Sequence, residues 1–490
     1  MKTESDGVQD LVTAYLKRTE GSYRFAEESS DFHVDKSSIV FGATEDTQKL
    51  AYPFVIERAE GSRVWDIDGN EYIDILQGLG ANLFGHNPSF IRERLSEAMK
   101  KGFAIGTQTT LVAEVSRLIH DLTGMPKVCF SNTGTEAIMT AIRIARAKTN
   151  RSKIVIFKDS YHGHVDWVIM RPSIAEIVRQ RIVSRLGELG LSAIGSVFKG
   201  LHFTRAIPAS VGIPNSMAKD VMVLNYGCSK SLNIIKKHRS KIAAVLVEPV
   251  QSRKPEIQPK EFLQSLREVT SHAGIGLIFD EMVTGFRTHP GGAQAYFDVK
   301  ADLVTYSKIA GGGLPLSIVA GREDFMSYLQ PTAGVERDRS IFFAGTFCKH
   351  PLSLVASHAT MQELISRGNS LQQGLNQKVA NMIENLNDLT NSYKIPVRFT
   401  HFGSFFSISL SESRMRPSQV NQLSYYLRYS GIHLRGGDRG GFLTTAHTDD
   451  EIRTINQTFI NGLRFVYGQK SWAETKSSGT LEHQEYERTY

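Results

Sequence analysis

Strand-like and helix-like segments alternate through the middle of this 490-residue chain, from Val112 to Thr305. Short apolar runs of strand length are separated there by stretches with helical periodicity. The candidate strands are Ile154–Phe157, Val221–Leu224, Ala243–Val247, Gly276–Phe279 and Leu303–Thr305. Because strands that alternate with helices form a sheet covered by helices on both faces, we predict an α/β fold.

Residues 1–75 are predicted to be an N-terminal segment that ends in a hairpin. The first ~35 residues are polar and irregular, with one short amphipathic stretch at Leu11–Leu16 and little to bury. After them, alternating apolar residues flank an Asp68-Gly69 turn, which is typical of two antiparallel strands. The same turn faintly resembles a calcium loop, but the downstream ligands are missing, so we expect no metal there.

Residues 346–468 are predicted to form a smaller C-terminal α+β domain, behind a large domain at 76–345. Two long helical patterns come first and strands follow, at Leu352–Ile365, Leu371–Leu389, near Val397 and at Phe405–Leu410. Residues 469–490 are polar and are expected to be a flexible tail.

Composition excludes several classes of protein. Apolar residues make up 41% of the chain, which excludes wholesale disorder. No run approaches the ~18 apolar residues that a membrane helix needs, and the N-terminus does not resemble a secretory signal. The three scattered cysteines indicate reduced thiols, so we expect a cytoplasmic protein. A net charge of +7 is too small to predict nucleic-acid binding.

A candidate phosphate site precedes the predicted helix Thr135–Ala147. The N–H groups and partial positive charge of a helix N-terminus bind phosphate, and Gly134 lets an anion approach the backbone. Thr135 adds an N–H and a hydroxyl. Small polar residues at this place also serve simply as helix caps, so both interpretations stay open.

An aromatic residue, Tyr161, follows the candidate strand Ile154–Phe157. An aromatic ring at the carboxyl end of a strand can stack on a planar cofactor. His162 and His164 flank Gly163 and lack acidic partners in the sequence, so they are expected to be solvated or supporting residues rather than metal ligands.

Two further candidate strands end in residues whose side chains could take part in catalysis. Asp280-Glu281 stand where an apolar strand stops, at the edge where open α/β sheets bind ligands; two solvated acids in a turn are the alternative. Lys308 follows the next strand and precedes three glycines, which suit close approach of a cofactor; an ordinary surface lysine is the alternative, and the preceding phosphate site, aromatic ring and Asp280 favour the first interpretation. It is a candidate Schiff-base lysine.

Together these parts meet the needs of pyridoxal phosphate, which requires a phosphate anchor, a stacking ring, a carboxylate and a lysine. An ionised Asp280 keeps the pyridine nitrogen protonated, so the ring can act as an electron sink. The freed amine of Lys308 can then move a proton between Cα of the substrate and C4′ of the cofactor.

Motifs across residues 35–465 occur together in one enzyme family. They are Phe84–His86, Asn132–Ala137, Tyr161–Gly163, Val247–Pro255, Asp280-Glu281, Ser307-Lys308, Gly311–Pro315 and Phe343–Phe347. With them the chain resembles class III, fold-type I aminotransferases of the glutamate-1-semialdehyde 2,1-aminomutase-like group. Within this group it most resembles those associated with polyketide and nonribosomal peptide assembly. The resemblance implies a mixed, mostly parallel seven-stranded sheet in the large domain.

The resemblance also implies roles for individual residues. Lys308 would form the aldimine with pyridoxal 5'-phosphate, Asp280 would pair with the pyridinium, and Tyr161 would stack on the ring as a further catalytic residue. The implied cofactor-binding set is Gly134, Thr135, Tyr161, His162, Glu248, Asp280, Met282, Lys308, Gly345 and Thr346. Gly134 and Thr135 would bind the phosphate, and Met282 would pack on the other face of the ring. Glu248, with Gln251, would lie near the phenolic oxygen.

Gly345 and Thr346 would reach the phosphate of the neighbouring subunit's cofactor. The resemblance therefore implies a homodimer with shared active sites.

Two departures from the family bear on the substrate. Ornithine- and GABA-type relatives carry Gly-Glu where this chain has Ser252-Arg253, so their arginine switch is absent. The aminomutase-like group usually has a Glu where this chain has Arg435 or Gly436. Loss of an acid that can hold a substrate amine argues against diamine chemistry and favours an aldehyde, ketone or anionic acceptor.

We therefore expect an aminotransferase that moves an amino group from a donor such as glutamate to a carbonyl of a secondary-metabolite intermediate, free or bound to a carrier protein. An intramolecular 2,1-aminomutase is the alternative. A cofactor-sensing or nucleic-acid-binding module is disfavoured, because the lysine and its partner acid are intact.

The segment Arg171–Arg205 holds six basic and two acidic residues. Its apolar spacing predicts a basic amphipathic helix followed by a Gly-rich loop. It is either a solvated insertion or a lid or docking helix that recruits an acidic carrier protein or a phosphorylated substrate.

Overall fold

The computed structural model describes residues 4–35, 42–173, 206–330 and 340–469, and the single residues 175, 176, 178, 179, 182, 185, 471, 472 and 474. The chain divides into two compact units. Unit 1 combines Met1–Arg92 with Leu371–Tyr490, and unit 2 is Glu93–Ser370.

Unit 2 is built on a seven-stranded sheet with the strand order β4-β12-β11-β10-β9-β5-β8. The strands are β4 (Lys127–Ser131), β5 (Lys153–Phe157), β8 (Val221–Leu224), β9 (Ile242–Val247), β10 (Gly276–Asp280), β11 (Leu303–Tyr306) and β12 (Ser317–Gly321). Strand β12 runs antiparallel to both of its neighbours, and the remaining neighbours pair in parallel. The predicted α/β class and the mixed, mostly parallel sheet are confirmed.

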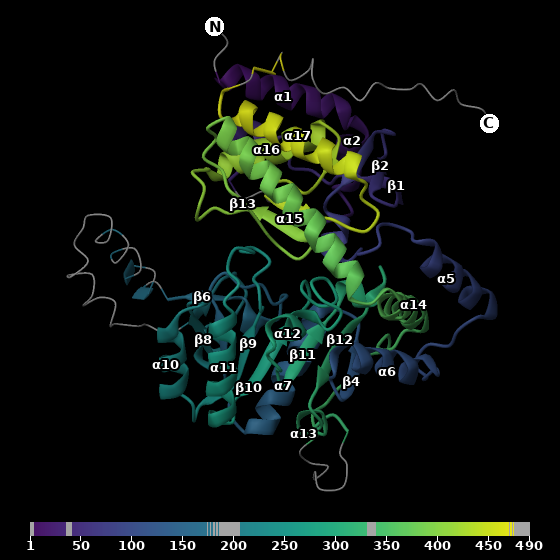
Figure 1. The fold of residues 1–490 in the computed structure, drawn as a ribbon, viewed down its shortest axis with the longest axis vertical. Helices are drawn as coiled ribbons and strands as arrows, with labels where there is room; N and C mark the ends of the chain where they lie inside the picture. The colour runs from purple at the N-terminus through teal and green to yellow at the C-terminus, as the bar shows by residue number, and fades with distance from the viewer. Residues whose placement is uncertain are drawn as a thin grey trace. The chain divides into compact units, whose positions relative to one another are not determined.

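Helices flank this sheet (Figure 1). They are α6 (Leu111–Thr123), α7 (Gly134–Thr149), α10 (Ser229–Lys237), α11 (Lys260–Ala273), α12 (Gly292–Phe297), α13 (Glu323–Met326) and α14 (Pro351–Arg367), and α5 (Ser89–Lys101) precedes them in the chain. A short hairpin, β6 (Met170–Pro172) with β7 (Ala206–Pro208), lies beside β8. Helix α7 packs on β12, β11 and β9 through buried residues such as Ile138 and Ile142. Strands covered on both faces become continuous apolar runs, and all six residues of β9 are buried.

Unit 1 joins both ends of the chain in one four-stranded sheet, ordered β1-β2-β3-β15. The N-terminal part supplies α1 (Glu4–Arg18), α2 (Glu20–Ser29), α3 (Glu45–Gln48), β1 (Ile56–Glu60), β2 (Arg63–Asp66), β3 (Glu71–Asp74) and α4 (Gln77–Gly80). The predicted hairpin is confirmed as β2 and β3, with Gly69 at a φ of 79° in the turn. Strand β15 (Ile432–His433) pairs in parallel with β3.

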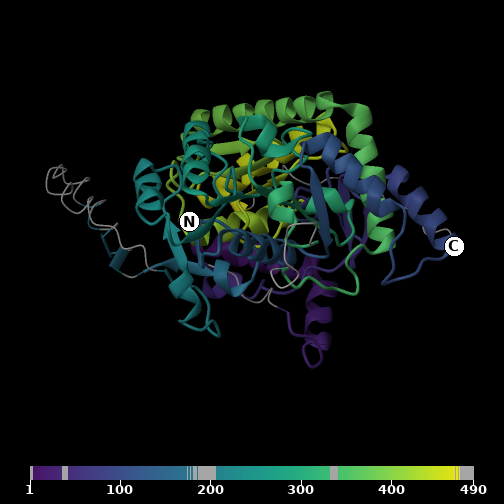
Figure 2. The ribbon, with the colours of Figure 1, turned by 90° about the horizontal axis from the view of Figure 1, so that it is seen from below.

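The C-terminal part of unit 1 supplies its long helices and a second sheet. These elements are α15 (Asn369–Ser392), α16 (Pro417–Tyr429), α17 (Asp449–Val466), and the antiparallel strands β13 (Phe399–Phe402), β14 (Phe405–Ile408) and β16 (Gly440–Phe442). Figure 1 shows α1, α16 and α17 side by side, and Figure 2 shows α15 as one long helix.

The prediction that the first ~35 residues are irregular is wrong. Helix α1 presents Val8, Leu11, Val12 and Tyr15, a stripe at helical spacing, and all four side chains are buried. They pack in a small cluster that also contains Tyr52 and Tyr425. The stripe is only two turns long, and it becomes a core only because distant residues cover it.

Other predictions concern residues that the structure describes only in part. Of the basic segment Arg171–Arg205, the described residues include an ion pair between buried Arg179 and Glu176. The rest of the predicted amphipathic helix and its Gly-rich loop lie outside the described residues, as does most of the tail at 469–490. Within the described residues, no helix is long and apolar enough to cross a membrane.

Candidate functional site

A polar residue lies at the carboxyl end of each of four neighbouring strands of unit 2. Strands β11, β10, β9 and β5 are parallel neighbours, so their carboxyl ends meet at one edge. Lys308 follows β11, Asp280 ends β10, Glu248 follows β9, and Tyr161 comes after β5. The sequence-predicted residues from separate motifs are therefore brought together at this edge.

Asp280 forms a buried pair with His162. Nδ1 of His162 donates to Oδ2 of Asp280 at 2.7 Å, and both side chains are almost fully buried. Oδ1 of Asp280 accepts the backbone N–H of Met282 at 3.1 Å. Nε2 of His162 is buried and has no hydrogen-bond partner among the described residues. The pair thus fixes the orientation of the Asp280 carboxylate, and both residues can still form a further hydrogen bond with a ligand.

Glu248 ties the Tyr161 segment to the loop after β9. Its Oε2 accepts the backbone N–H of Tyr161 at 2.9 Å, and its Oε1 accepts the N–H and the hydroxyl of Ser252, each at 3.2 Å. Burial raises the pKa of Glu248, against the opposing effect of His162. Gln251 donates to the carbonyl of Lys158 at 2.9 Å, which fixes the same two segments.

Lys308 has an unusual backbone and a perturbed amine. Its φ is 47°, in the left-handed region that side chains other than glycine rarely occupy. Burial lowers the pKa of its amine, although the carboxylates of Asp280 and Glu248 oppose this effect. The buried guanidinium of Arg287 lowers it further. A larger share of Lys308 is therefore neutral, and nucleophilic, than in an exposed lysine.

The candidate phosphate site is a capped helix start that touches other site residues. The hydroxyl of Thr133 accepts the N–H of Glu136, whose carboxylate accepts the N–H of Asn132 at 2.7 Å. A Cβ on Gly134 would lie 3.1 Å from Sδ of Met282, so only glycine leaves ordinary space there. The hydroxyl of Thr135 lies 3.2 Å from Nδ1 of His164.

The ring of Tyr161 is accessible, with 55% of the residue exposed. The guanidinium carbon of Arg253 lies 5.8 Å from its ring centroid, within cation–π range. In the sequence, Arg253 is evident only as a departure from the family. The hydrogen bonds of Glu248 to both Tyr161 and Ser252 explain how Arg253 comes to lie beside the ring.

Glu281 is a buried carboxyl group whose surroundings the sequence analysis did not predict. It accepts the N–H groups of Ala293 and Gln294 at 2.5 and 3.0 Å and the hydroxyl of Thr284 at 3.0 Å. Burial nevertheless raises its pKa to about 7. Its acceptors are engaged with the start of α12, so it holds the loop after Asp280 in place.

Gly345 and Thr346 are exposed in this single chain, in a loop next to the start of α7. Nδ2 of Asn132 lies 3.8 Å from Sγ of Cys348, and a Cβ on Gly345 would lie 2.5 Å from the same sulfur. The structure thus places this pair near Asn132, and its predicted role toward a neighbouring subunit stays a prediction.

The geometry fits pyridoxal 5'-phosphate. Within the described part of the chain, the carboxylate of Asp280 accepts two hydrogen bonds and Nε2 of His162 has no partner. Gly134, at a helix start, offers backbone N–H groups to a phosphate. The described residues contain no group of three or more His, Cys, Asp or Glu side chains that could hold a metal ion.

Comparison with known proteins gives consistent results. Residues 44–460 match the family "Aminotransferase class-III". A glutamate-1-semialdehyde 2,1-aminomutase from Oceanobacillus iheyensis is 32% identical over 413 residues, which are 82% of this chain and 88% of the relative. An omega-transaminase from Sphaerobacter thermophilus superposes with a TM-score of 0.78 at 25% identity, covering 92% of this chain and 100% of that structure. A glutamate-1-semialdehyde-aminomutase from Pseudomonas aeruginosa, solved in complex with PMP, shares the fold with a TM-score of 0.77 at 18% identity, over 94% of this chain and 98% of that one.

Proposed function

The chain belongs to the class-III aminotransferase family and is therefore a pyridoxal-phosphate-dependent enzyme, and we propose that it transfers an amino group from a donor such as glutamate to an aldehyde or keto group of a secondary-metabolite intermediate. The arrangement of Lys308, Asp280 and His162 at one sheet edge is the observation that carries amino-transfer chemistry. When bound, the cofactor supplies an electron sink and the carbon that carries the amino group.

In this proposal each residue of the edge has one task. Gly134 and Thr135 bind the cofactor phosphate at the start of α7, and Tyr161 and Met282 hold the two faces of the ring. Asp280, oriented by His162, accepts a hydrogen bond from the protonated ring nitrogen. Glu248 keeps Tyr161 in place through its backbone N–H.

Lys308 is the residue that holds the cofactor and moves the proton. Because burial lowers the pKa of its amine, the neutral form is available to take the proton from Cα of the substrate and to return it at the carbon that receives the amino group. The positive φ of Lys308 and the following glycines, Gly312 and Gly313, hold the amine at the end of β11.

The choice of an external acceptor over an aminomutase rests on the loop Arg435–Arg439. Of its charged side chains, Arg435 binds Asp438 with nitrogen–oxygen distances of 3.1 and 3.0 Å. The one acid of this loop is thus neutralised by an arginine and is a poor partner for a substrate amine. Because the aminomutase-like group usually has a Glu at Arg435 or Gly436, the proposal favours an acceptor with a carbonyl or an anionic group.

The intramolecular 2,1-aminomutase is the second candidate, because the relative from Oceanobacillus iheyensis carries that name. Adding glutamate alone to the holoenzyme distinguishes the two. Our proposal expects a change in the visible absorbance of the cofactor together with stoichiometric release of 2-oxoglutarate. If only a semialdehyde or a 4,5-diamino compound causes the change, the transaminase proposal is wrong.

A Lys308→Ala variant tests the site itself. We expect loss of the visible cofactor absorbance and of turnover, whereas Lys300→Ala, an exposed lysine of the same unit, should retain both. Retained turnover in Lys308→Ala would refute the assignment.

The proposal includes a homodimer in which Gly345 and Thr346 of one subunit bind the cofactor phosphate of the other. Their exposure in the single chain supports this arrangement. Mixing Lys308→Ala with Thr346→Asp subunits tests it: shared sites predict that mixed dimers regain part of the activity, and sites within one chain predict none.

The acceptor is proposed to be free or bound to an acidic carrier protein, with the basic segment Arg171–Arg205 as the docking element. Deleting residues 174–205 should then raise KM for a carrier-bound acceptor and spare the glutamate half-reaction. Equal loss of both would assign the segment to the fold alone.

A further inference from the structure

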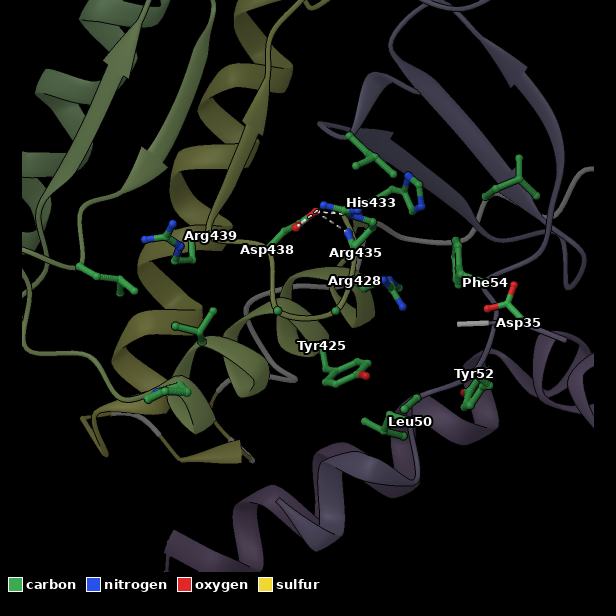
Figure 3. A pocket seen from close by; sticks show the side chains of 18 residues that line it. Asp35, Leu50, Tyr52, Phe54, Tyr425, Arg428, His433, Arg435, Asp438 and Arg439 are labelled. Atoms are coloured by element: carbon green, nitrogen blue, oxygen red, sulfur yellow. Dashed lines mark hydrogen bonds and ion pairs between the residues drawn. The ribbon is translucent and has the colours of Figure 1, made fainter. Parts of the chain in front are cut away.

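Unit 1 contains a cavity of about 620 Å³ (Figure 3). Its apolar lining comes from the N-terminal segment and from the region around α16: Leu50, Tyr52, Phe54, Ile56, Leu76, Leu410, Val420 and Tyr425. This volume and lining are typical of sites that bind small molecules with an apolar body.

Arg428, on α16, brings a buried charge to this cavity. The residue is only 5% exposed, and Figure 3 shows its side chain between Tyr425 and Phe54. Its guanidinium carbon lies 4.8 Å from the ring centroid of Phe54 and 5.8 Å from that of Tyr425. Aromatic faces stabilise a guanidinium in part, but they do not neutralise it.

The hydrogen-bond acceptors of Arg428 are uncharged. Its Nη1 donates to the hydroxyl of Tyr15 at 2.6 Å, and its Nε donates to the carbonyl of Leu434 at 3.1 Å. Nη2 donates to the same carbonyl. In the part of the chain that the structure describes, no carboxylate forms an ion pair with Arg428.

The other charged side chains at the cavity have partners of their own. Arg435 and Asp438 bind one another, as Figure 3 shows, and His433 donates to Asp74 at 2.8 Å. Arg439 donates to the carbonyl of Ile408 at 3.1 Å. Asp35 lies 3.8 Å from His33. Among the described residues, Arg428 is thus a buried arginine of this cavity whose hydrogen-bond acceptors are uncharged, and a ligand can balance its charge.

A buried charge without a counter-ion costs free energy, and an anion that enters the cavity recovers part of it. A guanidinium binds planar carboxylates with two parallel hydrogen bonds. We propose that this cavity binds a small carboxylate ligand with an aromatic or aliphatic body, with the carboxylate on Arg428 and the body against Tyr52, Phe54 and Leu410. The site goes beyond the proposed amino transfer, because none of the residues assigned to cofactor binding or to proton transfer lines it. The stretch Arg435–Arg439, whose sequence bears on the choice of acceptor, does line it.

Titration calorimetry on the full-length holoenzyme tests the charge requirement. The probe is 4-phenylbutyrate, and its amide, 4-phenylbutyramide, is the neutral control of nearly equal shape. We expect saturable binding of the acid and binding of the amide that is weaker by on the order of tenfold or more. Equal binding of both, or binding of neither, would overturn the proposal.

Variants then locate the binding. Leu410 is 46% exposed, so Leu410→Trp can fill the cavity without disturbing the core, and Ile365→Trp, at a residue 42% exposed on α14, is its matched control. We expect Leu410→Trp to weaken binding about tenfold and Ile365→Trp to leave it unchanged. Arg428→Gln should weaken binding as well, but it also breaks the contact with Tyr15, so the tryptophan pair decides. Unchanged binding in Leu410→Trp contradicts the site.

A Lys308→Ala control separates this cavity from the proposed reaction site. Binding of 4-phenylbutyrate should persist in that variant, whether or not the amino-transfer proposal is right. Loss of binding in Lys308→Ala would assign the probe to the reaction site and overturn the proposal of a separate one.

Discussion

Each unit buries an aspartate that binds histidine, and the two aspartates differ in how completely they are satisfied. Asp74 in unit 1 accepts four hydrogen bonds: from the rings of His86 and His433 at 2.7 and 2.8 Å, and from two backbone N–H groups at 2.8 and 3.0 Å. Asp280 in unit 2 accepts two, from His162 and from the backbone of Met282.

The difference separates a structural carboxylate from a binding one. A carboxylate has room for about four hydrogen bonds, so Asp74 has its capacity filled by the protein and Asp280 keeps about half of its own. Although burial opposes it, hydrogen bonds from His433 and His86 hold the pKa of Asp74 well below its usual range. A buried acceptor with spare capacity costs free energy unless a ligand completes it. This difference supports the proposal that Asp280 binds a ligand, whereas Asp74 is part of the fold.

The strongest test of the comparison is Asp280→Asn. We expect amino transfer to fall on the order of a thousandfold, because the neutral amide no longer stabilises a protonated ring nitrogen. The unfolding free energy should fall by only about 1–2 kcal/mol, because the amide oxygen keeps an acceptor for His162 and only the hydrogen bond from the N–H of Met282 is lost. Steady-state kinetics and urea unfolding measure the two effects. An active Asp280→Asn enzyme would contradict the assignment.

Asp74→Ala should show the opposite balance. Removing an acceptor from two histidines and two backbone N–H groups leaves buried donors without partners, and we expect a loss of roughly 4 kcal/mol in unfolding free energy. The activity per folded molecule should stay near that of the parent enzyme. Because the folded pKa of Asp74 lies below its ordinary value of 3.8, its stabilising contribution is present above that pH and is lost as pH falls. In Asp74→Ala, the unfolding free energy should therefore fall less steeply as the pH is lowered below 3.8 than in the parent enzyme. An equally steep fall, measured by urea unfolding at a series of acidic pH values, would contradict this reasoning.

The sequence predicted the strands of unit 2 better than the helices of unit 1. Five predicted strands agree with β5, β8, β9, β10 and β11 to within a residue or two at each end, because a sheet covered on both faces makes each strand a continuous apolar run. Strand β12, by contrast, reads Ser-Ile-Val-Ala-Gly between polar and glycine-rich stretches, and its pairing with β4 depends on residues far away in the sequence. For helix α1 the sequence indicated only the amphipathic stretch Leu11–Leu16, because its apolar stripe is short and its covering residues, such as Tyr425, lie at the other end of the chain.

For the candidate site, the sequence predicted which residues meet but not how they touch. The rule that parallel strands present their carboxyl ends at one edge was enough to bring together Lys308, Asp280 and Tyr161. The hydrogen bond between His162 and Asp280 spans 118 residues and depends on side-chain rotamers and on strand order, which no local pattern encodes. The approach of Arg253 to the ring of Tyr161 depends on the hydrogen bonds of Glu248 in the same way.

Glu281, next to Asp280, is a third buried carboxyl group. It accepts three hydrogen bonds, yet burial still raises its pKa. Its pKa of about 7 lies above the ordinary 4.5, so its contribution to stability is full below pH 4.5 and is lost as pH rises through 7. Glu281→Gln should remove this pH dependence, which amounts to roughly 3 kcal/mol at most. Thermal unfolding between pH 4.5 and 8 measures it, with the exposed Glu268→Gln on α11 as the control. A slope that survives in Glu281→Gln would assign the pH dependence to another group.

The smallest expected effect is on His162, where two substitutions separate the roles of the two ring nitrogens. Asn can replace Nδ1 as the donor to Asp280 and lacks Nε2, whereas Leu lacks both. If His162 acts by orienting Asp280, His162→Leu should lower kcat/KM about tenfold and His162→Asn by no more than about threefold. Cofactor retention after dialysis, followed by absorbance, should change in the same order. Equal losses in both variants would instead identify Nε2, the atom without a partner among the described residues, as the one that a bound group needs. His162 would then be a binding residue in its own right, and Asp280 would owe its orientation to the backbone of Met282.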